Sequence, residues 1–181
     1  MANINISEVG MEFSKSPVFA CSLSDIGLIY DDKLANQVLS TAPNELMRPP
    51  ADDGESRREA RAVSPKCTEA AIGLLRPVIE QIFAGPQFEL ARSRWNLFGV
   101  NYYETDDRFS LHHDFEKPDE IAVVILSLSG VRKLQVHNGQ SLELTADKIA
   151  FLDGRANPLH AAECTVGPSV SVVADVPNVH F

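Results

Sequence analysis

The chain has 181 residues, a typical size for one domain, and its 44% of hydrophobic and 23% of charged residues exclude wholesale disorder. With 16 basic and 25 acidic residues the formal net charge is −9, and such a charge disfavours a nucleic-acid partner. The longest apolar run, residues 121–126, is too short to cross a membrane and no segment has the form of a signal peptide, so we expect one cytoplasmic domain over residues 1–181.

The first 90 residues have a helical and irregular character. Residues 31–40 open with two aspartates and place apolar side chains on one side, which predicts a helix. Residues 43–64 contain adjacent prolines, an Asp-Asp-Gly turn and a charged run, which predict a mobile surface loop. Ser64-Pro65 resembles a helix N-cap followed by a first-turn proline, and Gly85-Pro86 ends the apolar-periodic segment that follows. Pro77 inside that segment predicts a kink or two short helices.

Residues 91–181 have the texture of a β domain. Segments rich in β-branched and aromatic residues alternate with turn signals, among which Asn138-Gly139 is the strongest hairpin signal. Ser129-Gly130 and Gly167-Pro168 also have the composition of turns. We expect strands at 95–103, 109–113, 121–128, 131–136, 142–144, 148–152 and 170–176. Short strands at this spacing predict a mainly β fold, a double-sheet jelly roll with helices packed on one face.

Three polar residues are candidates for one metal site. His112 and Asp114 are separated by one residue, so in a strand both side chains point to the same face, whereas His113 points the other way. His160 follows a turn-rich segment about four strands later and is the natural third ligand. Two histidines and one carboxylate on one side of a metal leave positions open for oxygen and an organic ligand, as in non-haem Fe(II) oxygenases. We expect this triad to be the catalytic metal centre, and the remaining histidines, His113, His137 and His180, to lie outside it.

Residues 101–114 read Asn-Tyr-Tyr-Glu-Thr-Asp-Asp-Arg-Phe-Ser-Leu-His-His-Asp. This segment resembles the Fe(II)/2-oxoglutarate-dependent oxygenases, above all the alkylation-repair branch, in which an Asn-x-Tyr strand leads into Ser-Leu-His-x-Asp. The resemblance extends over residues 101–176 and implies a double-stranded β-helix of cupin-like type, with Fe(II) and 2-oxoglutarate as cofactors. It also implies that Asn101 and Tyr103 hydrogen-bond 2-oxoglutarate. Residues 147–152 resemble the strand that the family places before its distal histidine, which supports His160.

The chain departs from the family pattern after the distal histidine. The family usually carries Arg-x-Ser there, and the arginine pairs with the remote carboxylate of 2-oxoglutarate. Ser171 fits the serine, but Ser169 stands where the arginine is expected, and the second arginine of the alkylation-repair branch falls at Asp175. A buried carboxylate without an opposing cation is costly, so another cation reaches in, the cosubstrate differs, or none is used. The candidate cations are Lys133 and Arg132 first, then Arg92, Arg94 and Arg155.

Three functions remain open at this point. The first is an Fe(II)-dependent oxygenase that uses oxygen and 2-oxoglutarate to hydroxylate or otherwise oxidise a small molecule. The missing arginine also permits a variant in which the substrate itself binds the iron. The second is a cupin-type metal dioxygenase or isomerase without 2-oxoglutarate, because residues 153–160 resemble the second cupin motif, although Asp114 replaces a histidine of the first. The third is a non-catalytic jelly-roll binding module. Neither fold nor motif specifies the substrate or the oligomeric state.

Overall fold

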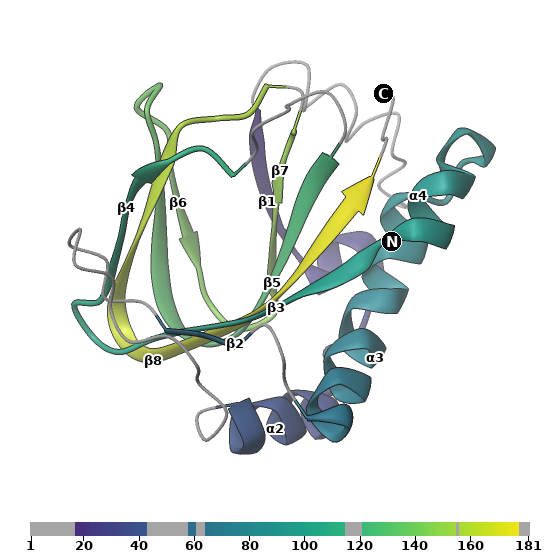
Figure 1. The fold of residues 1–181 in the computed structure, drawn as a ribbon, viewed down its shortest axis with the longest axis horizontal. Helices are drawn as coiled ribbons and strands as arrows, with labels where there is room; N and C mark the ends of the chain where they lie inside the picture. Colours follow the sequence, from purple (N-terminus) through teal and green to yellow (C-terminus); the bar gives the residue numbers. More distant parts are fainter. Residues whose placement is uncertain (1–16, 43–57, 61–63, 115–120, 155, 178–181) are drawn as a thin grey trace.

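The computed structural model describes residues 17–42, 58–60, 64–114, 121–154 and 156–177. They form a mainly antiparallel β structure with helices against one side (Figure 1). In the loop expected over 43–64, the structure describes residues 58–60, which form a strand, and Ser64. The other residues of that loop lie outside the described residues, and so do Arg155 and His180. No helix in the described ranges is both long and apolar enough to span a membrane.

The two longest helices begin where the sequence predicts them. Helix α2 (Asp32–Thr41) follows Asp31, whose side chain accepts a hydrogen bond from the backbone N–H of Leu34 at 3.0 Å. Helix α3 (Pro65–Ile82) follows Ser64 and has a proline in its first turn. Pro77 lies inside α3, which is one helix, so of the two expected outcomes, a kink or two short helices, the division into two does not occur. The burial of eight side chains along α3 outweighs the single hydrogen bond that the proline removes.

The end of α3 continues into more helix rather than into the β region. A short 3-10 turn (Pro86–Phe88) leads into α4 (Glu89–Arg94), and a further 3-10 turn, η1 (Leu23–Ile26), precedes α2. Arg92 donates hydrogen bonds from its guanidinium to the carbonyl groups of Phe83 and Gly85. This side chain therefore connects α4 to the end of α3, which accounts for one of the candidate cations as a structural group.

In the described part of the chain eight strands form the sheet, and β5 and β8 are by far the longest of them. The strands are β1 (Val18–Ser22), β2 (Arg58–Ala60), β3 (Asn96–Tyr103), β4 (Arg108–His112), β5 (Ile121–Val136), β6 (Ser141–Leu144), β7 (Lys148–Leu152) and β8 (His160–Pro177). Their order is β1-β7-β5-β8-β3-β2, with β4 beside β8 and β6 beside β5, and every pair is antiparallel. This arrangement confirms the mainly β fold, and Asn138-Gly139 forms the predicted hairpin between β5 and β6.

The two long strands bend together and so make the two walls of the roll. The first half of β5 pairs with the end of β8 in the wall that contains β1, β7 and β3, and its second half pairs with the start of β8 in the wall that contains β4 and β6 (Figure 1). Ser129-Gly130 and Gly167-Pro168, expected to be turns between strands, are instead bends inside them, marked by register shifts. Pairing on both sides of each bend keeps the strands continuous.

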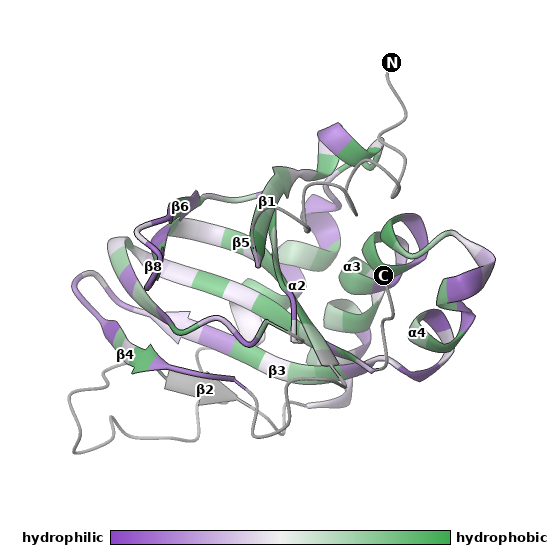
Figure 2. Ribbon diagram, turned by 90° about the horizontal axis from the view of Figure 1, so that it is seen from above, coloured by the Kyte–Doolittle hydropathy of each residue, from purple (hydrophilic) through white to green (hydrophobic). Residues whose placement is uncertain are grey.

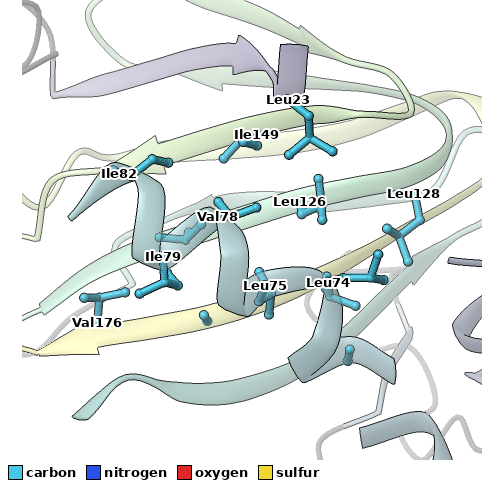
Figure 3. Packing of buried hydrophobic residues seen from close by; sticks show 14 of the residues in the cluster. Leu23, Leu74, Leu75, Val78, Ile79, Ile82, Leu126, Leu128, Ile149 and Val176 are labelled. Atoms are coloured by element: carbon cyan, nitrogen blue, oxygen red, sulfur yellow. The ribbon is translucent and has the colours of Figure 1, made fainter. Parts of the chain in front are cut away.

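Apolar side chains form two clusters, one on each side of the first wall. The outer cluster joins α3 to the sheet, where Leu75, Val78 and Ile79 pack toward Leu126 and Ile149 (Figure 3). The inner cluster lies between the two walls. Its buried members are Val18, Tyr103, Val123, Ile125, Leu134, Val136, Leu144, Ala150, Leu152, Ala162, Cys164 and Val173. In Figure 2, α3 and α4 occupy one end of the molecule and β4 and β6 the other, so the inner cluster faces away from the helices.

Gly130 allows the close contact of β5 and β8 at the bend. Its φ of +67° is in the left-handed region, and a Cβ atom there would lie 2.5 Å from the carbonyl oxygen of Val166 and 2.6 Å from that of Pro168. We expect Gly130→Ala to lower the free energy of unfolding by about 2–5 kcal/mol through backbone strain and overlap.

Gly139 is a matched control, because its φ is +90° but no heavy atom beyond its own chain neighbours lies within 4 Å of the position that a Cβ atom would take. Gly139→Ala should therefore cost only the strain, about 1–2 kcal/mol. Urea unfolding of both variants, followed by circular dichroism, measures the difference. Equal losses of stability would show that the contact of β5 with β8 at the bend is not tight.

Candidate metal centre

The three predicted metal ligands converge where β4 ends and β8 begins. His112 and His160 are direct partners in the β4–β8 ladder, and their ring centroids lie 4.3 Å apart. Asp114 follows two residues after the end of β4, with Oδ1 3.3 Å from Nε2 of His112 and Oδ2 3.5 Å from Nε2 of His160. One ligand atom from each of the three side chains lies within 4.8 Å of the others. The set can therefore hold one metal ion from one side.

Hydrogen bonds to the backbone orient both imidazole rings. Nδ1 of His112 lies 2.7 Å from the carbonyl oxygen of Ser110, and Nδ1 of His160 lies 2.8 Å from that of Pro158. A carbonyl oxygen only accepts, so each Nδ1 carries a proton and donates it. In a neutral ring Nε2 then has the free lone pair, and both Nε2 atoms face Asp114.

Burial favours the neutral, metal-binding form of His160. This residue is only 4% exposed, and burial lowers the pKa of its imidazole, while the nearby carboxylate of Asp114 acts in the opposite direction and only partly offsets the shift. A lowered pKa means that the ring stays unprotonated to lower pH than a free histidine does.

We expect the protein to retain its metal less well as the pH falls, as ligation by histidine requires. A proton and a metal compete for Nε2, so retention should be constant above about pH 7 and fall as the pH drops below about 6.5, the ordinary histidine pKa. Because the pKa of His160 is lowered, we expect protonation of this ring to contribute to metal loss only at the acidic end of this range. Equilibrium dialysis from pH 8 to pH 5, with the metal counted afterwards, measures the profile, and a flat profile would argue against histidine ligands.

The other histidines of the described chain lie outside the triad. His113 is exposed, and its Nδ1 is 2.6 Å from the carbonyl oxygen of Asn157, a contact that turns the ring away to the neighbouring loop. His137 is exposed just beyond the end of β5. Within the described ranges, His112, Asp114 and His160 are the one group of three such side chains close enough for a metal.

An aromatic ring that sequence reasoning missed supports the first ligand. The rings of Phe109 and His112 have centroids 3.6 Å apart. A register shift between these two residues lets both side chains face the interior although they are three positions apart. Strict strand alternation places them on opposite faces, so the pattern alone carried no signal for this contact.

Solved structures similar to this one share the same fold. A prolyl hydroxylase from Trichoplax adhaerens, in complex with a fragment of the hypoxia-inducible factor oxygen degradation domain, superposes with a TM-score of 0.66 at 10% identity, over 96% of this chain and 89% of that one. An oxidoreductase of the 2OG-Fe(II) oxygenase family from Burkholderia pseudomallei gives 0.62 at 12% identity, over 99% and 93% of the two chains. This chain has the fold of the 2-oxoglutarate/Fe(II) oxygenases.

The same fold occurs in the non-haem alpha-ketoglutarate-dependent epimerase SnoN of nogalamycin biosynthesis, with a TM-score of 0.64 at 14% identity over 93% of this chain and 80% of that one. No protein-family model and no curated protein matches the sequence. These similarities confirm the oxygenase fold that the sequence predicts, but they give no specific support to the alkylation-repair branch.

In this oxygenase fold, the residues assigned to 2-oxoglutarate by resemblance lie on the inner side of the first wall. Asn101 pairs with Ser171, which pairs with Ser127, so the three form a row across β3, β8 and β5. Tyr103 pairs with Ser169 one step along. All five residues are buried. Side chains alternate along a strand, and inner-cluster residues lie at even spacings from these five positions on the same strands. The five side chains therefore point toward the interior of the roll.

Several polar atoms in this row, and the hydroxyl group of the neighbouring Ser169, lack a hydrogen-bond partner among the described residues. In the part of the chain that the structure describes, no hydrogen bond reaches Oδ1 of Asn101 or the hydroxyl groups of Ser127, Ser169 and Ser171. Buried polar groups are nearly always hydrogen-bonded, so a cluster of unsatisfied ones indicates a place for a polar ligand. Ser127 was not predicted from the sequence, because it ends an apolar run that is typical of a buried strand.

The candidate cations separate into one buried residue and several outer ones. Lys133 is exposed, whereas its neighbour Arg132 is only 2% exposed and extends into the interior. Lys133, which the sequence analysis expects to bind the cosubstrate, therefore lies on the face opposite to Arg132, since adjacent residues of a strand point to opposite faces. Arg94 is exposed, and Arg92 is bonded to the end of α3.

Proposed function

We propose that this protein is an Fe(II)/2-oxoglutarate-dependent oxygenase that oxidises a small-molecule substrate. The observation that carries the proposal is the convergence of His112, Asp114 and His160 within this fold, with both Nε2 atoms and the carboxylate directed to one point. The unsatisfied polar atoms on the inner side of the first wall support a polar cosubstrate.

The donor set fits iron. Two neutral imidazoles and one carboxylate suit Fe(II) and leave coordination positions open on the opposite side. When bound, Fe(II) with 2-oxoglutarate and O2 would supply a two-electron oxidation of the substrate. The 2-oxo acid would become succinate, which takes one atom of the O2, and carbon dioxide, and the other oxygen atom would be available to the substrate.

The chain's own residues hold and shield this centre. The carboxylate of Asp114 lies near both Nε2 atoms, where it would offset part of the charge of a bound metal. The N–H groups of both imidazoles, bonded to the carbonyls of Ser110 and Pro158, keep the rings from rotating. Phe109 packs on His112, and the apolar inner cluster excludes water from the interior side.

Oxygen consumption distinguishes this proposal from the two alternatives. Protein purified without a histidine tag and reconstituted with Fe(II) under nitrogen is mixed with oxygenated buffer, with and without 2-oxoglutarate, and succinate is measured. We expect slow oxygen uptake and succinate formation that need both Fe(II) and 2-oxoglutarate. A protein that binds Fe(II) but forms no succinate contradicts the proposal and favours a cupin-type enzyme, and a protein that binds no metal favours a binding module.

A further inference from the structure

Arg132 carries a buried positive charge that no carboxylate of the described residues pairs with. The residue is 2% exposed, and in the described part of the chain its Nη2 has no hydrogen-bond partner. Its guanidinium carbon lies 4.9 Å from the centre of the Tyr103 ring, so an aromatic face is its neighbour on one side. A buried guanidinium is costly unless it is paired, so this arrangement is suited to an anion that arrives with a ligand.

The surroundings of Arg132 place its charge beside the polar row. Arg132 pairs with Cys164 across β5 and β8, and the thiol of Cys164 lies 3.7 Å from the carbonyl oxygen of Tyr103. Tyr103 is in turn the direct partner of Ser169. The guanidinium of Arg132 therefore reaches from the second wall of the roll to Tyr103 on the first wall. The strand partner of Tyr103 is Ser169, the position at which the family usually carries its arginine.

The position along the strand also agrees with a ligand that reaches the metal centre. Val136 pairs with His160, and Arg132 pairs with Cys164, so the cation and the metal ligand belong to the same inner face four residues apart. Four residues of strand correspond to about 13 Å between Cα atoms. An extended arginine side chain and a five-carbon diacid bound to the metal by its 2-oxo acid end can span this separation together.

We propose that Arg132, on β5, binds the remote carboxylate of a 2-oxo diacid in place of the arginine missing at position 169. The hydroxyl groups of Ser169 and Ser171 complete the hydrogen bonds to that carboxylate. This proposal rests on the proposed function and specifies its cosubstrate class, a 2-oxo acid with a second carboxylate rather than a monoacid. A guanidinium confers this preference because it binds a carboxylate through two parallel hydrogen bonds.

The first test compares two ligands on the wild-type chain. Protein loaded with Mn(II) in place of iron, under nitrogen, is titrated calorimetrically with 2-oxoglutarate and with 2-oxopentanoate, which has the same carbon chain without the second carboxylate. Loss of a hydrogen bond to a charged group weakens binding by about tenfold or more. We therefore expect 2-oxoglutarate to bind at least about tenfold more tightly. Equal affinities overturn the assignment of Arg132, whatever the stability of any variant.

The second test uses a matched pair of substitutions. Arg132→Gln and Lys133→Gln each remove one positive charge from adjacent residues, but only Arg132 is buried. We expect Arg132→Gln to lose at least about tenfold in affinity for 2-oxoglutarate, to bind 2-oxopentanoate as before and to retain its metal. Lys133→Gln should behave as wild type with both acids.

The results separate the two proposals. A folded Arg132→Gln protein with wild-type affinity for 2-oxoglutarate overturns the role of Arg132 and leaves the oxygenase function standing. A wild-type protein that holds Mn(II) but binds neither acid contradicts the proposed function itself. If Arg132 only packs on Tyr103, Arg132→Gln lowers the melting temperature without changing the ratio of the two affinities.

Discussion

Substitution of His112 or His160 by alanine is expected to abolish metal binding and any metal-dependent oxygen uptake. Each ring contributes one of three ligand atoms that lie within 4.8 Å of one another. Loss of an outer partner that merely orients a ligand costs 10–100-fold in metal affinity, so removal of a direct ligand should cost more than about a hundredfold. Metal content after dialysis, measured by atomic absorption, gives the result without a substrate.

The neighbouring histidine is the matched control. His113→Ala removes an imidazole one residue from His112, but that ring is exposed and contacts the carbonyl of Asn157 instead. We expect this variant to keep its metal. Full occupancy in His160→Ala, or loss of metal in His113→Ala with an unchanged melting temperature, would contradict the assignment of the triad.

The triad was predictable because its signal is local. His112 and Asp114 are two residues apart, and His160 follows a dense run of turn residues that places it at a strand end. The helix starts at Asp31 and Ser64 were predictable for the same reason, since a capping side chain bonds to a backbone group only three residues later.

Features that depend on pairing between distant segments were not predictable. Strand β1 (Val18–Ser22) exists because it pairs with β7 (Lys148–Leu152), and nothing in its own five residues distinguishes it from a coil. The bends at Gly130 and Pro168 have the composition of turns, and only the ladder between β5 and β8 on both sides shows that the strands continue.

The choice between Lys133 and Arg132 illustrates this limit at the scale of one residue. Val123, Ile125 and Ser127 face inward, and unbroken alternation along β5 would turn Lys133 inward as well. Register shifts between Ser127 and Arg132 change the parity, so Arg132 faces inward in the second half of the strand. A sequence pattern does not reveal such a shift.

Restoring the family's arginine with Ser169→Arg is expected to destabilise the protein strongly. Ser169 is fully buried, and its strand partner Tyr103 already lies under the guanidinium of Arg132. A second guanidinium would place two positive charges close together in the buried interior. Because an uncompensated buried charge costs about 3–5 kcal/mol, we expect the free energy of unfolding to fall by about that amount. Ser169→Ala, which removes only an unpaired hydroxyl, is the control and should change stability little.

The double variant Arg132→Ser with Ser169→Arg moves the charge without adding one. If both positions serve the same carboxylate from opposite walls, the exchange should recover most of the stability lost in Ser169→Arg. It should also recover the preference for 2-oxoglutarate over 2-oxopentanoate that Arg132→Ser alone abolishes. Urea unfolding and calorimetric titration of the four proteins form a double-mutant cycle, in which a coupling energy of about 0.5–3 kcal/mol or more is expected for residues that share a partner. Strictly additive effects would show that positions 132 and 169 do not face a common ligand site, because independent residues have no way to compensate for each other.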